Sequence, residues 1–318
     1  MKEKKTYPLI SVVMPIYNSA RFLRKSIPSV MAQEYPNLEI VLLNNGSTDD
    51  SATIIDEYAK QDSRIKAYTI AHVGTPKESR DNAIYRAKGE WIIGVDSDDS
   101  IENDYVEKLW ERHLETGADC VCGKMLYRDE KMNILPYSVP DSDFDNKQIM
   151  NGTEAMLRTL FRYEIGLNGA LWKKSIREIK MDKIYTDEAY GRVFLNNCNK
   201  VAFTDASYYV TVQSESVSRK ITATSVMYQP IGMLGVYNYF LSKYGADSVL
   251  VYGMIIHIYR LYRQMVHQLV RFKLKSQLND SQKEYIQDMY AVLRSRRNII
   301  GLKRWINTRI LHLMTKRL

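Results

Sequence analysis

Three aspartates stand within four residues, at Asp96, Asp98 and Asp99, directly after the apolar run at 90–95. Carboxylates held this close raise one another's pKa and repel. A divalent cation is the simplest compensation, because Mg²⁺ and Mn²⁺ prefer one or two carboxylates and complete their shell with diphosphate oxygens and water. Such an ion could neutralise a diphosphate leaving group. In the simpler alternative, Asp98-Asp99-Ser100 only caps the following helix.

Alternating strands and helices must hold this cluster in place. Short apolar runs rich in β-branched residues predict buried strands, and apolar residues at helical spacing predict the helices between them. The order is strand 9–14, helix 20–33, strand 38–43, a helix ending near 60, strand 65–70, helix 77–87 and strand 90–95. This alternation predicts an α/β fold with a mostly parallel sheet flanked by helices.

The unusual polar residues of this region fall where the predicted strands end. They are Tyr17-Asn18, Asn44-Asn45-Gly46 and the segment 96–99. In open sheets of this kind, ligands bind at the carboxyl ends of the strands. The sequence therefore predicts one site built from these loops.

In the rest of the chain, the secondary-structure pattern of the sequence changes twice. Residues 101–122 predict a helix and an apolar strand, 124–150 look loop-like, and 153–212 mix helix and strand patterns. From residue 222 onward the pattern is almost wholly helical, with an apolar face along 254–269. We therefore predict two domains, one over 1–220 that carries the site and a helical region over 221–318.

The composition excludes several classes of protein. Three cysteines cannot build a disulfide framework or a four-cysteine zinc site, which favours a reducing compartment. No run reaches the roughly 18 uninterrupted apolar residues of a spanning helix, and the N-terminal apolar run does not resemble a signal peptide. Hydrophobic residues at 45% and charged residues at 26% are typical of a globular protein.

Five short motifs between residues 12 and 99 resemble the family 2 glycosyltransferases of bacterial cell-surface or capsular polysaccharide synthesis. They are VVMPIYN (12–18), NNGSTD (44–49), SRDN (79–82), AKGEWI (87–92) and DSDD (96–99). The likeness extends over residues 8 to 215. It implies the A-type fold, whose α/β sheet binds a nucleotide. It also implies an inverting transfer from a nucleotide-diphosphate sugar donor, favouring a UDP-sugar, with Mn²⁺ or Mg²⁺ as cofactor.

The resemblance implies a role for the matching residues of the first two motifs. Pro15, Ile16 and Tyr17 would line the base and ribose, with Tyr17 packed on the nucleotide. Relatives usually carry aspartate at the position of Asn45, where its carboxylate accepts the uracil N3–H. An amide oxygen can accept the same hydrogen bond, although the amide also donates. The alternatives are that Tyr17 is a core aromatic residue and that Asn44 only forms an Asn-Gly turn.

The same resemblance implies which residues bind the diphosphate and the cation. Arg80 would reach the diphosphate, a role that suits an always-charged guanidinium. Asp96 and Ser97 belong to the donor-binding part of the aspartate motif, and Asp98 and Asp99 are the predicted metal ligands. In the alternative, Arg80 is a surface helix residue.

An inverting transfer also needs a base that takes the proton of the acceptor hydroxyl. Family members carry it in a Glu-Asp pair that opens a helix after the metal motif, and Asp187 matches that base. Thr186 replaces the usual glutamate and Glu188 follows, so an alternative assignment is shifted by one residue. Asp187 could also be a helix N-terminal acid favoured by the dipole. Trp172 matches a segment near the acceptor in relatives, although it could equally be a core residue. Residues 213–220 resemble a stretch that closes over the diphosphate in relatives.

The last 25 residues are basic and amphipathic. Residues 294–318 hold eight lysines and arginines and no acidic residue, interleaved with apolar residues that include Trp305. This pattern is typical of an interfacial helix on anionic lipid. In the alternatives, the helix packs on its own domain or on a second copy of the chain, as a homodimer. We predict a cytoplasmic protein, peripheral at the inner face of the membrane, that acts on a glycan or lipid-linked acceptor.

Other functions are open to the same sequence. A nucleotidyltransferase would share the sheet and the cation but needs a Gly-rich, lysine-bearing loop, and residues 15–19 hold neither glycine nor lysine. A non-catalytic nucleotide-sugar-binding scaffold docked to the membrane would bind the donor without turnover. A nucleic-acid partner is disfavoured, because the basic tail has no recognisable reading motif.

Overall fold

The structure, a computed structural model, describes residues 7–136, 145–160, 168–177, 187–213 and 221–301, and residues 304, 305, 308, 309 and 312. The chain divides into two compact units. The first comprises Met1–Ala155, Tyr163–Ile179 and Phe194–Gln213, and the second comprises Met156–Arg162, Lys180–Val193 and Ser214–Leu318. The boundary predicted after residue 220 lies close to the end of the first unit, but two earlier segments also belong to the second.

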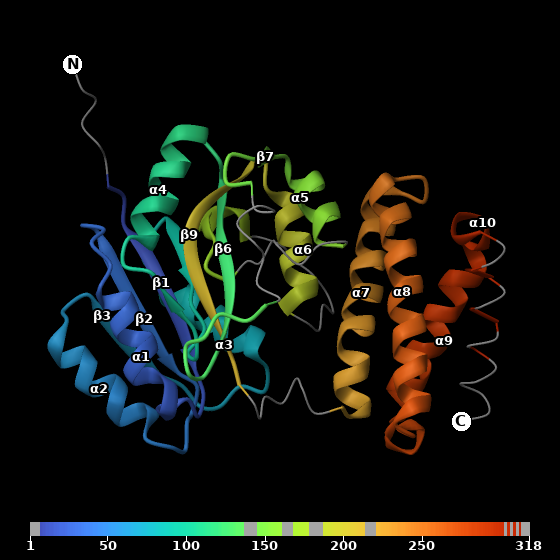
Figure 1. The fold of residues 1–318 in the computed structure, drawn as a ribbon, viewed down its shortest axis with the longest axis horizontal. Coiled ribbons are helices and arrows are strands. Elements are labelled where there is room, and N and C mark those ends of the chain that lie inside the picture. The colour runs from blue at the N-terminus through green and yellow to red at the C-terminus, as the bar shows by residue number, and fades with distance from the viewer. Residues whose placement is uncertain are drawn as a thin grey trace. The chain divides into compact units, whose positions relative to one another are not determined.

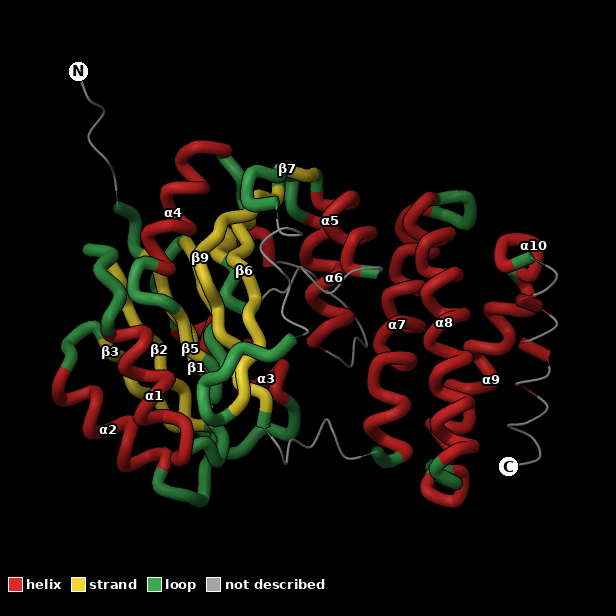
Figure 2. Tube along the Cα trace, in the orientation of Figure 1, coloured by secondary structure: helices red, strands yellow, loops and turns green. Residues whose placement is uncertain are grey.

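The first unit begins with strands and helices in alternation, as the sequence predicts (Figure 1). β1 pairs in parallel with both β2 and β4, and β2 pairs in parallel with β3. Because such crossovers are right-handed, α1 and α2 cover one face of the sheet and α3 covers the other (Figure 2). The elements are β1 (Ile10–Ile16), α1 (Ala20–Met31), β2 (Leu38–Asn44), α2 (Ser51–Gln61), β3 (Ile65–Thr69), α3 (Pro76–Arg86) and β4 (Trp91–Gly94).

Beyond β4 the sheet becomes mixed. Its order is β3-β2-β1-β4-β8-β6-β9-β5, with β7 paired to β9. β8 runs antiparallel to both β4 and β6, whereas β9 runs parallel to β6. The elements of this part are β5 (Ser100–Ile101), α4 (Tyr105–Thr116), β6 (Cys120–Asp129), β7 (Ile149–Met150), β8 (Leu171–Lys173), a 3₁₀ turn (Lys174–Arg177) and β9 (Val201–Val212). The predicted α/β class with a flanked sheet is confirmed.

β6 is longer than the sequence predicts. The polar composition of 124–150 indicates a loop, but the strand continues to Asp129, because it pairs there with the last residues of β9. Lys124 and Arg128 on this stretch are only 7% and 4% exposed, and burial lowers the pKa of each. Pairing with a neighbouring strand therefore overrides the local polarity.

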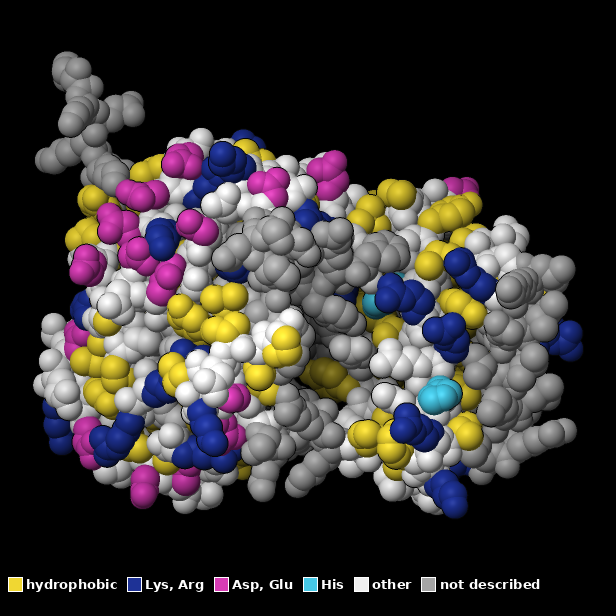
Figure 3. All heavy atoms as spheres, viewed as in Figure 1, with side chains coloured by type: hydrophobic (Ala, Val, Ile, Leu, Met, Phe, Trp, Pro, Cys, Tyr) yellow, Lys and Arg dark blue, Asp and Glu magenta, His cyan; other side chains and the backbone are white. Residues whose placement is uncertain are grey.

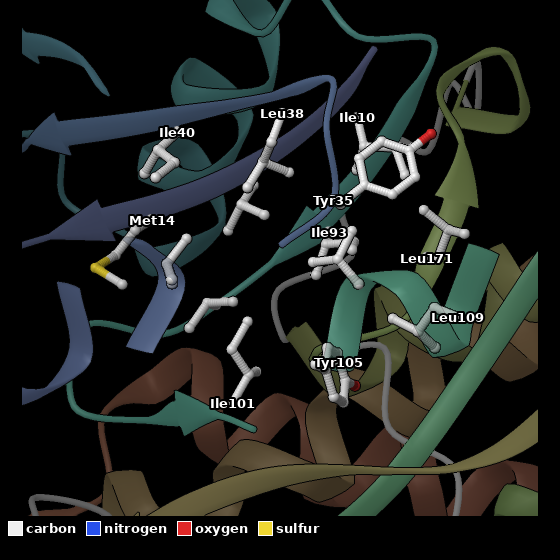
Figure 4. Close-up of a cluster of buried hydrophobic side chains, with 14 of the residues drawn as sticks. Ile10, Met14, Tyr35, Leu38, Ile40, Ile93, Ile101, Tyr105, Leu109 and Leu171 are labelled. Carbon is white, nitrogen blue, oxygen red and sulfur yellow. The ribbon is translucent and has the colours of Figure 1, made fainter. Parts of the chain in front are cut away.

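The core of the first unit lies against the parallel strands. β2 is buried along its whole length and β1 nearly so, as expected for a sheet covered on both faces. Figure 4 shows strand and helix side chains that meet in this core, among them Ile10, Met14, Ile40, Ile93, Tyr105 and Leu109. This packing gives the strand ends a rigid base from which the site loops leave.

The described residues of the second unit from 223 onward are mostly helical. α8 packs against both α7 and α9. Thr222 caps α7 and Asn279 caps α9, each accepting a backbone N–H three residues later. None of the described helices is long and apolar enough to span a bilayer. The elements are α7 (Ala223–Tyr244), α8 (Val249–Arg271), a 3₁₀ turn (Lys275–Gln277), α9 (Asp280–Ser295) and α10 (Arg297–Ile300); α5 (Gly152–Thr159) and α6 (Asp187–Asn197) contribute residues to both units.

The described side chains of the C-terminal tail pack within the second unit. Trp305 stacks on Tyr290 of α9 with 5.8 Å between ring centroids, and His312 stacks on the same ring at 3.6 Å. His312 Nδ1 lies 3.3 Å from the hydroxyl of Tyr262 on α8, and Thr308 is fully buried. At these positions the tail has the internal packing that the sequence left open as an alternative to lipid contact.

A buried histidine on α8 predicts that stability depends on pH. His257 is 5% exposed, and its pKa is lowered from 6.5 to about 4 by burial and by the nearby Arg192 and Arg260. The unfolded chain therefore binds this proton at a higher pH than the folded chain does, so stability falls as the pH drops from 6.5 toward 4. We expect this residue to lower the free energy of unfolding by about 2 kcal/mol between pH 7 and pH 5.

Chemical unfolding at the two pH values measures this effect. His257→Phe removes the titrating group and should abolish that part of the difference, whatever it does to stability at pH 7. His267→Gln, at an exposed position of the same helix, is the matched control and should keep the full difference. Equal pH dependence in the wild type and in His257→Phe would contradict the prediction.

Candidate active site

Three loops meet at the carboxyl ends of β1, β2 and β4. The Ser19 hydroxyl lies 2.7 Å from the Ser97 hydroxyl, which joins the loop after β1 to the aspartate motif. Asn18 Oδ1 accepts the backbone N–H of Thr48 at 2.8 Å, which joins the same loop to the one after β2. The loops that the sequence placed at one site are therefore in contact.

The end of β1 carries the residues predicted to line the base. Ile16 is fully buried and Pro15 is half-buried, both within the strand. Tyr17 leaves the strand, is 46% exposed, and stacks on His72 with 4.2 Å between ring centroids. Tyr17 is therefore not a core residue, and the pair presents an aromatic surface beside the loops. Sequence reasoning missed His72, because a lone loop histidine carries no pattern.

Asn45 is hydrogen-bonded to the backbone of the loop that contains Val73. Its side chain is 3% exposed, with Oδ1 accepting the Val73 N–H at 2.8 Å and Nδ2 donating to the Val73 carbonyl at 3.2 Å. An aspartate could not donate to that carbonyl, which gives the amide at this position a local structural reason. Gly46 follows with φ +66°, and a Cβ there would lie 2.7 Å from the backbone nitrogen of His72. The turn therefore requires glycine.

Asp96 is held between a cation and an amide. Arg80 donates to Oδ1 at 2.9 Å, and Asn168 Nδ2 donates to Oδ2 at 2.6 Å. The Arg80 and Asp96 side chains are 24% and 32% exposed, so Arg80 is not a freely solvated helix residue. α3 instead places its guanidinium at the site, where an anionic ligand could compete with Asp96 for it.

Asp99 faces the sheet. It is 4% exposed; its Oδ2 accepts the Tyr208 hydroxyl at 2.9 Å, and its Oδ1 accepts the Thr211 N–H at 2.8 Å. The Tyr208 hydroxyl also accepts the Asp96 N–H at 3.1 Å. Burial, together with Asp96 and Asp98, raises the pKa of Asp99 well above its usual range. Both carboxylate oxygens of Asp99, which the sequence predicts to be a metal ligand, therefore accept hydrogen bonds from β9.

Asp98 is half-buried and bonded to the end of β9. Its Oδ2 accepts Gln213 Nε2 at 2.6 Å, and Gln213 Oε1 accepts Arg21 Nη2 at 2.6 Å. Burial and the charge of Asp96 raise the pKa of Asp98, whereas the Gln213 bond and Arg21 act in the opposite direction. Sequence reasoning treated residue 213 only as the start of a closing stretch, and the remainder of that stretch, 214–220, lies outside the described residues.

The sequence profile of glycosyl transferase family 2 matches residues 11–179, which is more than half of the chain. The chain belongs to glycosyl transferase family 2. The matched region holds all of β1 except Ile10, β2 to β4, the three contacting loops and the aspartate motif. The family resemblance of these motifs is confirmed.

Known glycosyltransferases resemble this one in sequence or in fold. Glycosyltransferase GlyG of Streptococcus pneumoniae is 37% identical over 136 residues, 43% of this chain and 45% of GlyG, so the match spans less than half of that relative. TarS 1-349 of S. aureus, in complex with UDP-GlcNAc, has a TM-score of 0.63 at 17% identity and covers 90% of this chain and 81% of its own. Mannosyltransferase PcManGT of Pyrobaculum calidifontis, in complex with GDP-Man and Mn²⁺, has a TM-score of 0.57 at 11% identity, covering 98% and 86%. These two structures share the fold.

This family 2 glycosyltransferase has two carboxylates suited to a cation. Within the described residues, no group of three or more His, Cys, Asp or Glu side chains forms a metal cage. Asp96 and Asp98 are partly exposed on one loop, whereas Asp99 is buried. Mg²⁺ commonly binds one or two carboxylates and takes its other ligands from substrate phosphates and water. The donor set therefore fits a cation that arrives with a diphosphate.

The predicted base and acceptor residues are described only in part. Asp187 is the first residue of α6 and belongs to the second unit, while the side chains of Asp187 and Glu188 lie outside the described part of the chain. Trp172 lies in β8, is 8% exposed, and its ring contacts Phe194 at 5.1 Å between centroids. Trp172 therefore packs in the core of the first unit.

Removing the Gln213 side chain should impair the enzyme. We expect Gln213→Ala to lower kcat/KM by about tenfold or more, because a hydrogen bond to a charged group contributes roughly 1.5–3 kcal/mol. Arg21→Ala should act similarly, and the double variant should lose little more than either single one, since both work through one bridge to Asp98. Gln264→Ala, at an exposed position of α8, is the control. Fully additive losses would contradict the bridge.

Proposed function

We propose that this glycosyltransferase moves a sugar with inversion from a nucleotide-diphosphate donor, preferably a UDP-sugar, to a glycan or lipid-linked acceptor in surface polysaccharide synthesis. The supporting observation is the joint position of Asp96, Asp98 and Arg80 at the carboxyl ends of parallel strands in a family 2 chain. This set combines two carboxylates for a cation with a guanidinium for a diphosphate. We assign the catalytic domain to residues 1–220 and the helical region to 221–318.

The donor side of the proposal uses the loops after β1, β2 and β4. Tyr17, which projects from the strand end formed by Pro15 and Ile16, packs on the base. Asn45 shapes the base pocket through its two bonds to Val73. Ser97 and Asp96 face the ribose and diphosphate, and Arg80 exchanges Asp96 for the diphosphate when the donor binds. The preference for uridine rests on the family pattern; TarS was solved with UDP-GlcNAc and PcManGT with GDP-Man.

The cation of this proposal is Mn²⁺ or Mg²⁺. When bound, it would neutralise the diphosphate as the bond to the sugar breaks. We assign Asp98, with Asp96, as its ligands in place of the predicted pair Asp98 and Asp99. Asp99 is only 4% exposed and bonded to β9, whereas Asp96 and Asp98 are partly exposed, and Asp96 Oδ1 becomes free when Arg80 turns to the diphosphate. Asp99 then acts by holding the loop that carries the ligands, as residues behind a metal site commonly do.

Asp187 is the proposed base. It takes the proton of the acceptor hydroxyl while that oxygen attacks the anomeric carbon, and the nucleotide diphosphate leaves from the opposite face. One carbon–oxygen bond forms as another breaks, and the configuration inverts. The proposal is supported by the position of Asp187 at the first residue of α6, since family members carry the base where a helix opens after the metal motif.

The second part of the chain carries a large excess of positive charge. Residues 221–318 hold 15 lysines and arginines and four aspartates and glutamates, which suits an anionic surface. We propose a cytoplasmic enzyme, peripheral at the inner face of the membrane, where a lipid-linked or growing glycan would be within reach. The alternative to membrane binding is that the same helical region forms a homodimer.

A panel of UDP, GDP and dTDP sugars tests this function. Thermal unfolding and donor hydrolysis are measured with and without Mn²⁺. We expect UDP-sugars with Mn²⁺ to raise the Tm, since a donor at 100 times its Kd stabilises the fold by about 2.7 kcal/mol. If no nucleotide diphosphate binds with Mn²⁺ present, the proposal is wrong. Binding without turnover on any acceptor would instead support a non-catalytic scaffold.

A further inference from the structure

One face of α8 changes from apolar to cationic along its length. Residues three or four apart on a helix share a face, and Val249, Tyr252, Gly253 and Ile256 follow that spacing over two turns. Val249 and Tyr252 are 64% and 43% exposed. Two exposed arginines continue the same face toward the C-terminus. We define the α8 face as Val249, Tyr252, Gly253, Ile256, Arg260 and Arg263.

The apolar half of the α8 face lines a groove. A cavity of about 540 Å³ lies between this half, Leu157 and Arg158 of α5, and Ile299 of α10, all within the second unit. Gly253 allows a close approach here, because a Cβ would lie 2.9 Å from Leu157 Cδ2. Apart from Arg158, the lining side chains are apolar or aromatic. The volume falls within the range of small-molecule sites, roughly 300–1,000 Å³.

The charge beside the groove selects its occupant. α8 contains no aspartate or glutamate. At 1.5 Å per residue, Arg260 and Arg263 lie about 6 and 10 Å along the axis from Ile256. Figure 3 shows Lys and Arg side chains beside hydrophobic ones over α8 and α9 on the visible face. An amphiphile with an apolar chain and an anionic head complements both halves of this surface.

We propose that the α8 face binds an anionic phospholipid of a membrane surface, with an acyl chain in the groove and the phosphate beside Arg260 and Arg263. Its residues belong to the second unit and none is part of the proposed donor site. The proposal also moves the apolar contact with lipid away from the tail, where Trp305 and His312 stack on Tyr290. Because the α8 face shares no residue with the proposed donor site, lipid binding does not depend on the assigned donor chemistry.

Co-sedimentation of the full-length chain with vesicles tests the proposal. We expect binding to phosphatidylglycerol vesicles, weakened by salt, and little binding to phosphatidylcholine vesicles. The variant Arg260→Gln/Arg263→Gln should bind roughly 25-fold more weakly, at about fivefold for each arginine. The variant Val249→Ser/Tyr252→Ser should bind about tenfold more weakly, because the groove loses apolar surface that contacts the acyl chain. Circular dichroism checks that both variants fold.

Control variants change other exposed residues of the second unit. Tyr244→Ser/Phe272→Ser and Arg294→Gln should bind vesicles like the wild type. Stabilisation by UDP with Mn²⁺ is measured in every variant and should not follow vesicle binding. The proposal is overturned if the α8 variants bind normally, or if Arg304→Gln/Arg309→Gln alone removes binding, which would assign it to the tail. If the α8 variants bind vesicles normally but self-associate less in sedimentation-velocity experiments, the occupant of the groove is a second copy of the chain.

Discussion

Asp98→Asn should reduce the rate of sugar transfer by about 1,000-fold or more while leaving the Tm nearly unchanged. Asp98 is the proposed ligand of the cation that neutralises the leaving diphosphate, and an amide is a much poorer ligand for a hard cation. An asparagine oxygen can still accept the hydrogen bond from Gln213, so the fold should tolerate the change. Measurement of kcat/KM over a range of Mn²⁺ concentrations, with thermal unfolding in parallel, separates the two effects.

Two further variants make this experiment specific. Asp50→Asn is the matched control, because Asp50 is exposed at the start of α2 and its side chain makes no capping hydrogen bond. It should leave both activity and Tm unchanged. Asp99→Asn should lower the Tm, since it disturbs buried bonds to Tyr208 and Thr211. If Asp99→Asn removes the dependence on Mn²⁺ and Asp98→Asn does not, the cation belongs on Asp99.

Asp187→Asn should lower transfer to the acceptor by about 1,000-fold without changing the Kd for UDP. General bases contribute about 10²–10⁴-fold to such reactions, and an amide cannot take the proton of the attacking hydroxyl. In the proposal the donor is held by Tyr17, Arg80 and Asp98, and Asp187 contacts only the acceptor hydroxyl. Steady-state transfer kinetics and calorimetric titration with UDP and Mn²⁺ provide the two measurements.

Glu188→Gln is the control for the assignment of the base. The two acids are adjacent at the start of α6, and the usual glutamate before the base is replaced by Thr186. Under the proposal, Glu188→Gln keeps most of the transfer activity. If Glu188→Gln loses transfer and Asp187→Asn keeps it, the base is Glu188. If both variants transfer normally, the base lies elsewhere in the chain.

The parallel half of the sheet was predictable because its signals are local. The apolar runs that become β1 and β2 and the helical spacing of α1 each lie within a dozen or so neighbouring residues. The rule that ligands bind at the carboxyl ends of parallel strands then placed the three loops together. The contact between Ser19 and Ser97 is consistent with that placement.

Structural features that depend on residues far away in the sequence could not be predicted from the local sequence pattern. β8 enters antiparallel between β4 and β6, and β6 continues through a polar stretch because β9 lies beside it. The sequence predicts Asp98 and Asp99 alike as metal ligands, but only the tertiary fold turns Asp99 toward Tyr208 and leaves Asp98 partly exposed. Likewise, the pattern suggests a base contact for Asn45, whereas its amide bonds to the backbone of Val73.

The hydrogen bonds between the aspartate motif and β9 set an order of events during synthesis of the chain. Tyr208 and Thr211 follow Asp99 by 109 and 112 residues, and Gln213 follows Asp98 by 115. The strands that carry the three loops emerge from the ribosome long before these partners. A nascent chain that ends before β9 therefore contains the parallel strands but lacks the hydrogen-bond partners of Asp98 and Asp99. We therefore expect the proposed donor site to be completed late in translation, after β9 and Gln213 have been made.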